Sequence, residues 1–337
     1  MGNNCYCSKD KAHCTENFQD PIKCYLYLAV KYFDRYRTKQ MILVDFGSSY
    51  GMKTIEIMNF LVEYLQKSNK LQHKPLIIHN DLSTNNWSQV FSMILCHSSY
   101  FACGLGRSFY EQCLPDRSLS IGYSSASLHH LSIKPCNILQ HCYIHFGDLN
   151  EKLLFEKQAQ LDFECFLQHR SRELHKGGIL ILNIPSRNEQ DQLGFNQYFD
   201  LIYEIARTIL SDTELIDFTL PFYLRSFNEC SDNKDLFVRY SLKLVRTDFI
   251  RFHSTIFVQY QTKKITFEQF IHSLVDLMHS GIDSCFRQLF KLHQRTEQDI
   301  EYLSKQLWTK FEDKIRNDTH PKEIFVYSTL MILKKIE

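Results

Sequence analysis

Glycine, proline and tryptophan are scarce in this 337-residue sequence, which contains 11 Gly, 7 Pro and 2 Trp. Because glycine is rare, we expect each cluster of glycines to mark a turn that the backbone requires. Long apolar runs are also lacking: no stretch of 18 apolar residues occurs, so we expect no membrane span. Neither charge is in excess, because 39 basic residues balance 38 acidic ones. The sequence therefore lacks the positive field that attracts nucleic acid, and we expect no nucleic-acid partner.

Twelve cysteines are present, and they bear on the cellular compartment. The first ten residues, MGNNCYCSKD, contain no apolar segment of the kind that a secretory signal requires. Without such a signal, the cysteines are typical of reduced thiols, and we expect a cytoplasmic protein. Cys5, Cys7, His13 and Cys14 do not form the two ligand pairs of a zinc knuckle, so we expect no metal there.

The pattern of apolar residues indicates the fold. Apolar residues make up 44% of the chain and aromatic residues 14%, which excludes a disordered protein. The length fits about two domains, or one large domain with an insertion. Apolar runs alternate with helical patterns as far as residue 210, and this alternation predicts an α/β fold with a mostly parallel sheet and helices on both faces. The expected strands lie at 41–46, 76–81, 100–102, 119–123 and 179–184, and the expected helices at 55–65, 86–95 and 151–174.

The last third of the chain departs from this alternation. Two strand-like runs at 236–246 and 249–259 are followed by long amphipathic helices at 266–279 and 283–313. A final strand, 324–333, follows Pro321. We therefore predict a helical cap that is inserted before the last strands of the sheet.

Two loops at strand ends are candidates for ligand binding, because ligands of open parallel sheets bind outside the carboxyl ends of the strands. The loop from Asp45 to Gly51 lacks the glycine spacing of a dinucleotide fingerprint, and no Lys-Ser or Lys-Thr pair of a P-loop follows it. One strand later, Asp81 could accept hydrogen bonds from both hydroxyls of a ribose. Alternatively, the glycines only turn the chain and Asp81 caps a helix.

Several segments considered together indicate a function more specifically than the two loops do alone. Their order and spacing resemble the SABATH family, the plant-type S-adenosylmethionine-dependent carboxyl methyltransferases, over residues 40–337. The segments that carry the resemblance are 44–54, Asn80–Leu82, Arg107–Tyr110, Ser124–Ser132, 163–178 and 220–223.

The resemblance implies a Rossmann-like methyltransferase core with an inserted helical cap over the acceptor pocket. Residues 1–39 would form an N-terminal leader and a substrate-proximal segment. The other boundaries implied are a core of 40–212, 236–259 and 322–337, and a cap of 213–235 and 260–321.

By the same resemblance, the cofactor is S-adenosylmethionine. The loop with Gly47, Ser48 and Gly51 would approach its methionine end, together with Asp45. Lys53 is a further cofactor-binding residue by this resemblance, although the family usually has Asn at its position. Asp81 would hold the ribose and Leu82 would lie beside the sugar and base, while Ser108 and Phe109 would flank the adenine.

The acceptor implied is a small-molecule carboxylic acid. His129 matches the family, whereas His130 replaces a Trp and Ala126 replaces a pocket Tyr. A His could still donate a hydrogen bond to the acid, more strongly if it is protonated, and Gln19 is a candidate for the second donor. Residues that the family associates with magnesium are not reproduced, so we expect no required metal.

The implied reaction is direct in-line displacement that gives a methyl ester. A carboxylic acid with a pKa of about 4 is ionised at neutral pH, so no general base is needed. Two alternatives stay open: N- or O-methylation of a neutral small molecule, with His129 or His130 as base, and a non-catalytic scaffold that retains the fold. The family also suggests a homodimer.

Overall fold

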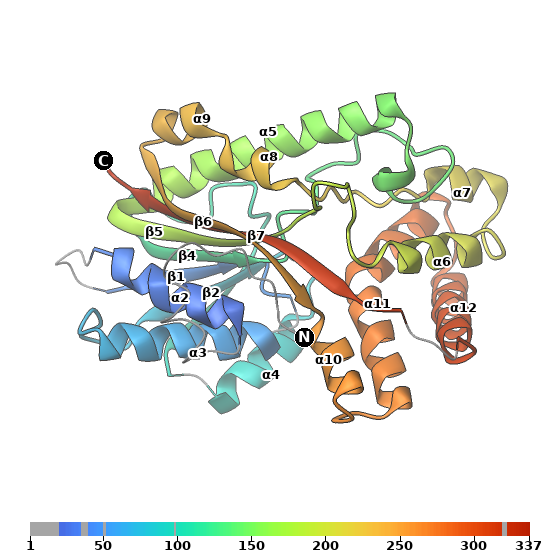
Figure 1. Ribbon diagram of the computed structural model, residues 1–337, viewed down its shortest axis with the longest axis horizontal. Coiled ribbons are helices and arrows are strands. Elements are labelled where there is room, and N and C mark those ends of the chain that lie inside the picture. Colours follow the sequence, from blue (N-terminus) through green and yellow to red (C-terminus); the bar gives the residue numbers. More distant parts are fainter. Residues whose placement is uncertain (1–19, 35–39, 50–51, 98, 319–321) are drawn as a thin grey trace.

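Seven strands in the described part of the chain form one sheet at the centre of the molecule (Figure 1). The computed structural model describes residues 20–34, 40–49, 52–97, 99–318 and 322–337. The strand order is β3-β2-β1-β4-β5-β7-β6, in which β1 to β5 pair in parallel and β7 pairs antiparallel with both β5 and β6. The strands are β1 Ile42–Phe46, β2 Leu76–Asp81, β3 Phe101–Gly106, β4 Leu119–Ser125, β5 Leu174–Pro185, β6 Leu242–His253 and β7 Phe325–Lys335.

Helices cover both faces of the sheet. On one face, α2 (Pro21–Tyr32) and α3 (Met52–Lys67) pack on Leu43, Ile77, Ile121 and Ile181, and α4 (Trp87–His97) follows β2 on the same side. On the other face, α5 (Leu149–Glu173) packs through its aromatic side chains on strand residues that alternate with the first set. The alternation of strand side chains between the two faces thus produces two separate apolar layers.

The remaining helices gather beyond the end of the sheet at which β5 finishes and β7 begins (Figure 1). A large apolar cluster of aromatic and aliphatic residues joins them, separate from the two layers that flank the sheet. These helices are α6 Asn196–Ala206, α7 Asp212–Asp217, α10 Thr255–Gln261, α11 Phe267–Leu292 and α12 Glu297–Arg316, while the short α8 Phe227–Ser231 and α9 Lys234–Arg239 lie near α5.

The α/β fold, its strand–helix alternation and its helix-rich C-terminal third are confirmed, but two local predictions are wrong and one helix was not predicted. The two strands expected at 236–246 and 249–259 are one strand, Leu242–His253, between the helices α9 and α10. The expected helix break at 279–283 lies at 292–297. Helix α2 was not predicted, although Asp20 accepts a hydrogen bond from Ile22 N as its N-cap and Pro21 occupies the first turn, both of which are start signals.

Three further features concern membranes, metals and thiols. Within the described ranges, no helix is long and apolar enough to cross a membrane. The same residues contain no group of three or more His, Cys, Asp or Glu side chains arranged to hold a metal ion. Cys24 is disulfide-bonded, contrary to the expectation of reduced thiols, whereas seven other described cysteines are free, namely Cys103, Cys113, Cys136, Cys142, Cys165, Cys230 and Cys285.

Candidate active site

The predicted site residues that the structure describes lie mainly at the carboxyl ends of β1, β2, β3 and β4. These strands are neighbours in the sheet and parallel, so their final residues meet at one edge. Gln19 and Gly51 lie outside the described residues. Lys53 is exposed on the first turn of α3, and none of the contacts within the described residues links it to Asp45 or Ser48.

The loop after β1 needs a glycine at its first position. Gly47 has a φ of +86°, and a Cβ atom there would lie 2.1 Å from Ser127 Oγ. The amides of Gly47 and Ser48 donate to Asn80 O at 2.9 and 3.0 Å, which draws the loop over the end of β2. Ser48 Oγ is buried and has no hydrogen-bond partner among the described residues. The turn is therefore required by backbone geometry, and it leaves one hydroxyl available to a ligand.

Asp81 connects the first two loops. Its carboxylate accepts hydrogen bonds from Ser49 N at 2.7 Å and from Leu82 N at 2.8 Å. Burial raises the pKa of this carboxyl, and the two backbone donors oppose the shift. A carboxylate has about four acceptor positions, so Asp81 can hold the loop and still bind the two hydroxyls of a ribose. Leu82, beside it, is 54% exposed and presents an apolar side chain.

Asp45 is the most perturbed acid of the site. Its side chain is 3% exposed, and burial, reinforced by the charge of Asp81, raises its pKa to about 8. No cation among the described residues pairs with it. A buried carboxylate in this position favours a positively charged ligand group, because such a group would offset the cost of its burial.

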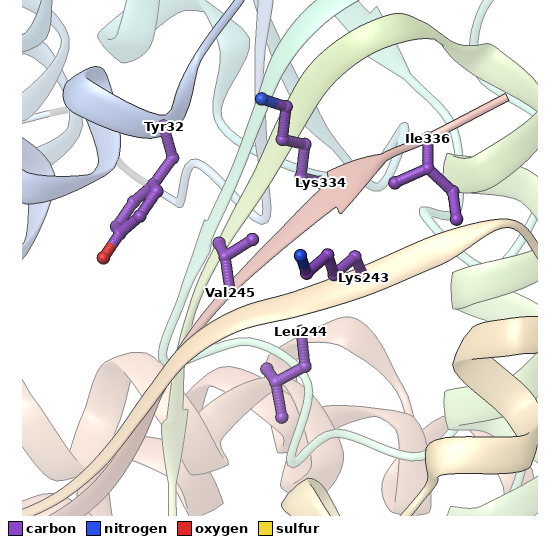
Figure 2. A pocket seen from close by; sticks show the side chains of 6 residues that line it. All are labelled: Tyr32, Lys243, Leu244, Val245, Lys334 and Ile336. Atoms are coloured by element: carbon purple, nitrogen blue, oxygen red, sulfur yellow. The ribbon is translucent and has the colours of Figure 1, made fainter.

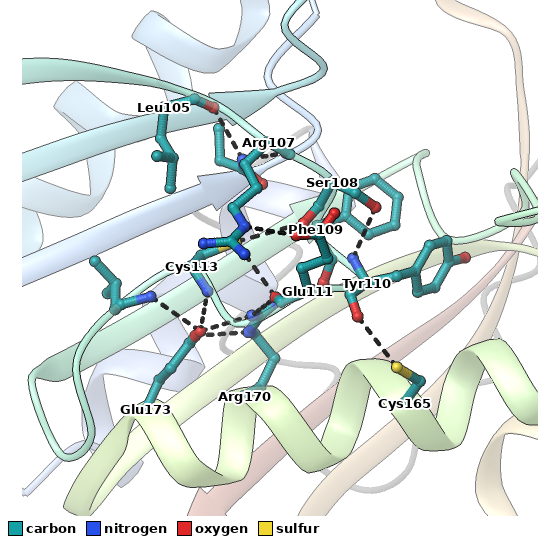
Figure 3. A network of polar contacts seen from close by, with 12 residues as sticks. Leu105, Arg107, Ser108, Phe109, Tyr110, Glu111, Cys113, Cys165, Arg170 and Glu173 are labelled. Atoms are coloured by element: carbon teal, nitrogen blue, oxygen red, sulfur yellow. Dashed lines mark hydrogen bonds and ion pairs between the residues drawn. The ribbon is translucent and has the colours of Figure 1, made fainter.

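Ser108 and Phe109 lie on a segment that a buried ion pair holds in place (Figure 3). Arg170 Nη1 donates to Phe109 O at 2.6 Å, and its Nε donates to Glu173 Oε2 at 2.8 Å. Glu173 Oε1 accepts from the amides of Cys113 and Leu114 at 2.5 and 3.1 Å.

Both charged side chains of this pair, Arg170 and Glu173, are fully buried. The guanidinium also lies 4.2 Å from the centre of the Phe46 ring at the end of β1. The pair thus joins α5, the Ser108–Phe109 segment and β1. Arg170 and Glu173 lie in the segment 163–178 that carries the family resemblance, but the sequence analysis predicted no role for them.

The loop after β4 forms the other half of the site. Ala126 has a φ of +52° and is exposed, and its amide donates to Asn183 O at 3.0 Å. The rings of His129 and His130 have centroids 4.3 Å apart, and His130 lies 4.5 Å from Phe222.

The two imidazoles are neutral at physiological pH. Burial lowers the pKa of His130 to about 4, and burial together with the His130 ring lowers the pKa of His129 well below its usual value. His129 Nδ1 is buried without a hydrogen-bond partner. The structure therefore does not favour a protonated His130 as carboxylate donor.

Three side chains that the sequence analysis missed hold the backbone around these rings. Tyr110 donates through its hydroxyl to His130 O at 2.6 Å, and the buried Arg225 donates to Leu128 O at 2.6 Å. Arg187 donates to Leu224 O at 2.6 Å and pairs with Glu229 at the same distance. All of these bonds end on backbone or on distant residues, so spacing along the chain carries no signal for them.

A groove lies at the opposite end of the sheet (Figure 2). Its volume is about 410 Å³, and it is lined by Tyr32, Lys243, Leu244, Val245, Lys334 and Ile336. Lys334 pairs with Ile179, the first residue of β5 that pairs with β7, which places the groove away from the carboxyl end of β5. Its ammonium pairs with Asp34 at 2.5 Å. None of the predicted site residues lines this groove.

Comparison with known proteins defines the family. The profile of the SAM dependent carboxyl methyltransferases matches residues 27–335, so the chain belongs to this family. Among solved structures, a loganic acid methyltransferase with SAH has the same fold, with a TM-score of 0.66 and 20% identity over 94% of this chain and 92% of the other. The resemblance found in the sequence and the fold class are thus both confirmed.

The curated relatives match a smaller part of this chain than the solved structure does. Loganic acid O-methyltransferase of Catharanthus roseus is 29% identical over 55% of this chain and 56% of its own length. Farnesoic acid carboxyl-O-methyltransferase of Arabidopsis thaliana is 30% identical, with coverages of 57% and 62%. A probable S-adenosylmethionine-dependent methyltransferase of the same plant is 27% identical, with coverages of 57% and 60%. The matches to these three relatives span less than two thirds of their length.

Proposed function

We propose that this chain transfers a methyl group from S-adenosylmethionine to the carboxylate of a small organic acid and releases a methyl ester. The observation that carries the proposal is the match to the carboxyl methyltransferase family over residues 27–335. At the carboxyl edge of the sheet, the residues fit the cofactor that this family uses. Asp45 is a buried acid without a cation, Ser48 has an unpartnered hydroxyl, and Asp81 retains free acceptor positions.

In this proposal each end of the cofactor has its own residues. Asp45 faces the ammonium of the methionine end, Ser48 and the Gly47 loop approach the same end, and Asp81 binds the ribose. Leu82, Ser108 and Phe109 surround the base. When bound, the cofactor supplies an activated methyl group on a sulfonium.

The acceptor is bound by neutral groups. The N–H groups of His129 and His130 donate to the carboxylate, with Gln19 as a further donor, and Ala126 leaves space where the family has a Tyr. The acid is ionised at neutral pH, so no residue would be needed as a base. Transfer of the methyl group to the carboxylate oxygen would break the bond to the sulfonium sulfur and leave S-adenosylhomocysteine. The residues contribute by orienting this oxygen and by excluding water.

The two alternative functions receive less support. An imidazole whose pKa is about 4 is a weak base at neutral pH, which disfavours activation of a neutral acceptor by His130. A scaffold without catalysis would have no need of a buried acid such as Asp45, since its burial is costly.

The proposal also covers the cellular location, the partners, the oligomeric state and the domain boundaries of the protein. A cytoplasmic location is supported by seven free thiols but not by the disulfide at Cys24. A net charge of +1 disfavours nucleic acid as a partner. We also propose a homodimer, and a cap formed by 213–235 and 260–321 over a core of 40–212, 236–259 and 322–337. Helix α6, in the first of these core segments, packs in the same apolar cluster as the cap helices. Residues 1–39 would approach the acceptor. Sedimentation of the purified protein tests the dimer.

Calorimetric titration of S-adenosylmethionine into the wild type and Asp81→Asn tests the proposed function. We expect binding that weakens at least tenfold in the variant, about 1.4 kcal/mol. A panel of carboxylic acids with methyl-labelled cofactor then tests transfer, with the labelled ester as product. Failure of the wild type to bind the cofactor, or binding without transfer to any acid, contradicts the proposal.

A further inference from the structure

Asn183 lies at the carboxyl end of β5, next to the loops to which we assign the acceptor. Its side chain is 8% exposed, and Nδ2 donates to Ser125 Oγ at 2.8 Å. Ser125 is in turn a hydrogen-bond partner of the buried Tyr123. The bond to Ser125 uses Nδ2, so Oδ1 is the polar atom of the amide that is left for a further partner.

Asn183 Oδ1 is buried and accepts no hydrogen bond from any of the described residues. The neighbouring strands do not supply a donor. On one side Asn183 pairs with Leu330 of β7, which is apolar, and on the other with Ser125, which already bonds to Nδ2. A buried carbonyl oxygen without a donor is costly, so this position favours a ligand that donates a hydrogen bond.

The position of Asn183 separates it from the cofactor end of the site. Asp45 pairs with Tyr123 of β4, and β5 lies one strand further along the sheet. Adjacent strands are about 4.8 Å apart, which places Asn183 about 10 Å across the sheet from the strand of Asp45. On the acceptor side the link is direct, because Asn183 O accepts the amide of Ala126. Asn183 therefore belongs to the acceptor half.

We propose that Asn183 Oδ1 accepts a hydrogen bond from a hydroxyl group of the acceptor, so that the preferred substrates are hydroxy-substituted carboxylic acids. This inference rests on the proposed function, because it concerns the same acceptor. His129 Nδ1 is a second buried, unpartnered atom, on the loop that begins at Ala126. The acid would thus be held at two points: its carboxylate by the imidazoles and its hydroxyl by Asn183.

Pairs of acids that differ by one hydroxyl test the inference. The probes are benzoic and 3-hydroxybenzoic acid, and octanoic and 8-hydroxyoctanoic acid, titrated calorimetrically in the presence of S-adenosylhomocysteine. In the wild type we expect the hydroxy acid of at least one pair to bind tenfold or more tightly than its partner. Asn183→Leu should reduce this ratio to about one. Asn183→Asp, which keeps an acceptor oxygen, should retain the preference, and Ser125→Ala should reduce it in part.

Each outcome decides between the inference and the proposed function. A preference that persists in Asn183→Leu, or wild-type protein that binds both acids of each pair equally, overturns the inference while methyl transfer still supports the function. Hydroxy-dependent binding that Asn183→Leu abolishes, without transfer to any acid, overturns the proposed function and supports only the hydrogen bond between a bound hydroxyl and Asn183. Thermal melting of each variant identifies loss of folding, in which case Asn183→Asp and Ser125→Ala decide.

Discussion

The two halves of the candidate site are built differently. In the cofactor half, the loops are held by carboxylates: Asp81 binds two backbone amides, and the buried Arg170–Glu173 pair fixes the segment with Ser108 and Phe109. In the acceptor half, neutral side chains line the site, and the backbone is held by the donors Tyr110 and Arg225 and, at Ser132, by the carboxylate of Asp162.

This difference corresponds to what each half has to recognise. The cofactor carries a cation and a ribose, which favour acids in fixed positions, whereas the acceptor is an anion, for which nearby carboxylates would be repulsive. Two of the positions that depart from the family resemblance, Ala126 and His130, lie in the acceptor half, and one, Lys53, lies among the predicted cofactor contacts. The two halves are nevertheless joined at two points, because Tyr110, beside Phe109, donates to His130 O at 2.6 Å and Ser127 Oγ donates to Gly47 O at 3.2 Å.

Loss of the buried ion pair should have the largest effect. Arg170→Ala leaves Glu173 buried without its partner, so we expect the free energy of unfolding to fall by about 3–5 kcal/mol. Urea denaturation measures this change. The matched control is Arg172→Ala on the same helix, whose exposed ion pair with Asp116 should contribute little. Equal effects of the two substitutions would contradict the role of the buried pair.

Cofactor binding should depend on pH through Asp45, whose pKa is about 8. The free protein holds this proton at neutral pH, and a cation pairs with the ionised form, so affinity should rise by about tenfold per unit as the pH increases toward 8. Asp45→Asn should bind weakly without this dependence.

Asp45 also has an opposite effect on the stability of the free protein. The native state retains the proton between about pH 4 and 8, whereas the unfolded chain has lost it, so the contribution of Asp45 to stability falls as pH rises through this range. Calorimetry of binding and thermal melting across this range measure both. A cofactor affinity in the wild type that does not vary between pH 6 and 8 would show that Asp45 does not pair with the cation.

The acceptor half should behave in the opposite way. Because the pKa of His130 is about 4, its ring stays neutral from pH 6 to 9, and kcat/KM for the acid should be constant over this range at saturating cofactor. His130→Phe should raise KM about tenfold, while His130→Gln, which keeps an N–H donor, should recover part of the loss. A steady decline in activity from pH 6 to 8 would instead indicate a protonated imidazole.

The smallest effect is expected at Tyr110. Removal of its hydroxyl in Tyr110→Phe breaks the bond to His130 O and should lower the free energy of unfolding by about 1 kcal/mol. Because this bond positions the backbone of His130, kcat/KM for the acid should fall a few-fold while cofactor affinity stays the same. An equal loss of cofactor affinity would mean that the two halves are coupled through Tyr110.

The sequence by itself determined the features that depend on neighbouring residues. Alternating apolar runs and helical periods predicted the parallel sheet, and the consecutive residues of the Asp45–Gly51 loop and the Asp81 turn predicted a cofactor edge at the strand ends. Local patterns suffice for these features, because side-chain direction and turn geometry repeat along the chain. The strand ends of β1, β2 and β4 therefore agree closely with expectation.

Other features were decided only by the tertiary structure. Residues 236–239 have an apolar pattern that suggested a strand, yet they form a helix whose Phe237 completes the core beneath α5. The neutral state of His130, the Arg170–Glu173 clamp and the unpartnered oxygen of Asn183 have no local signal. Each depends on burial among residues that are distant in the chain, and burial sets the cost of a charge or of a missing hydrogen bond.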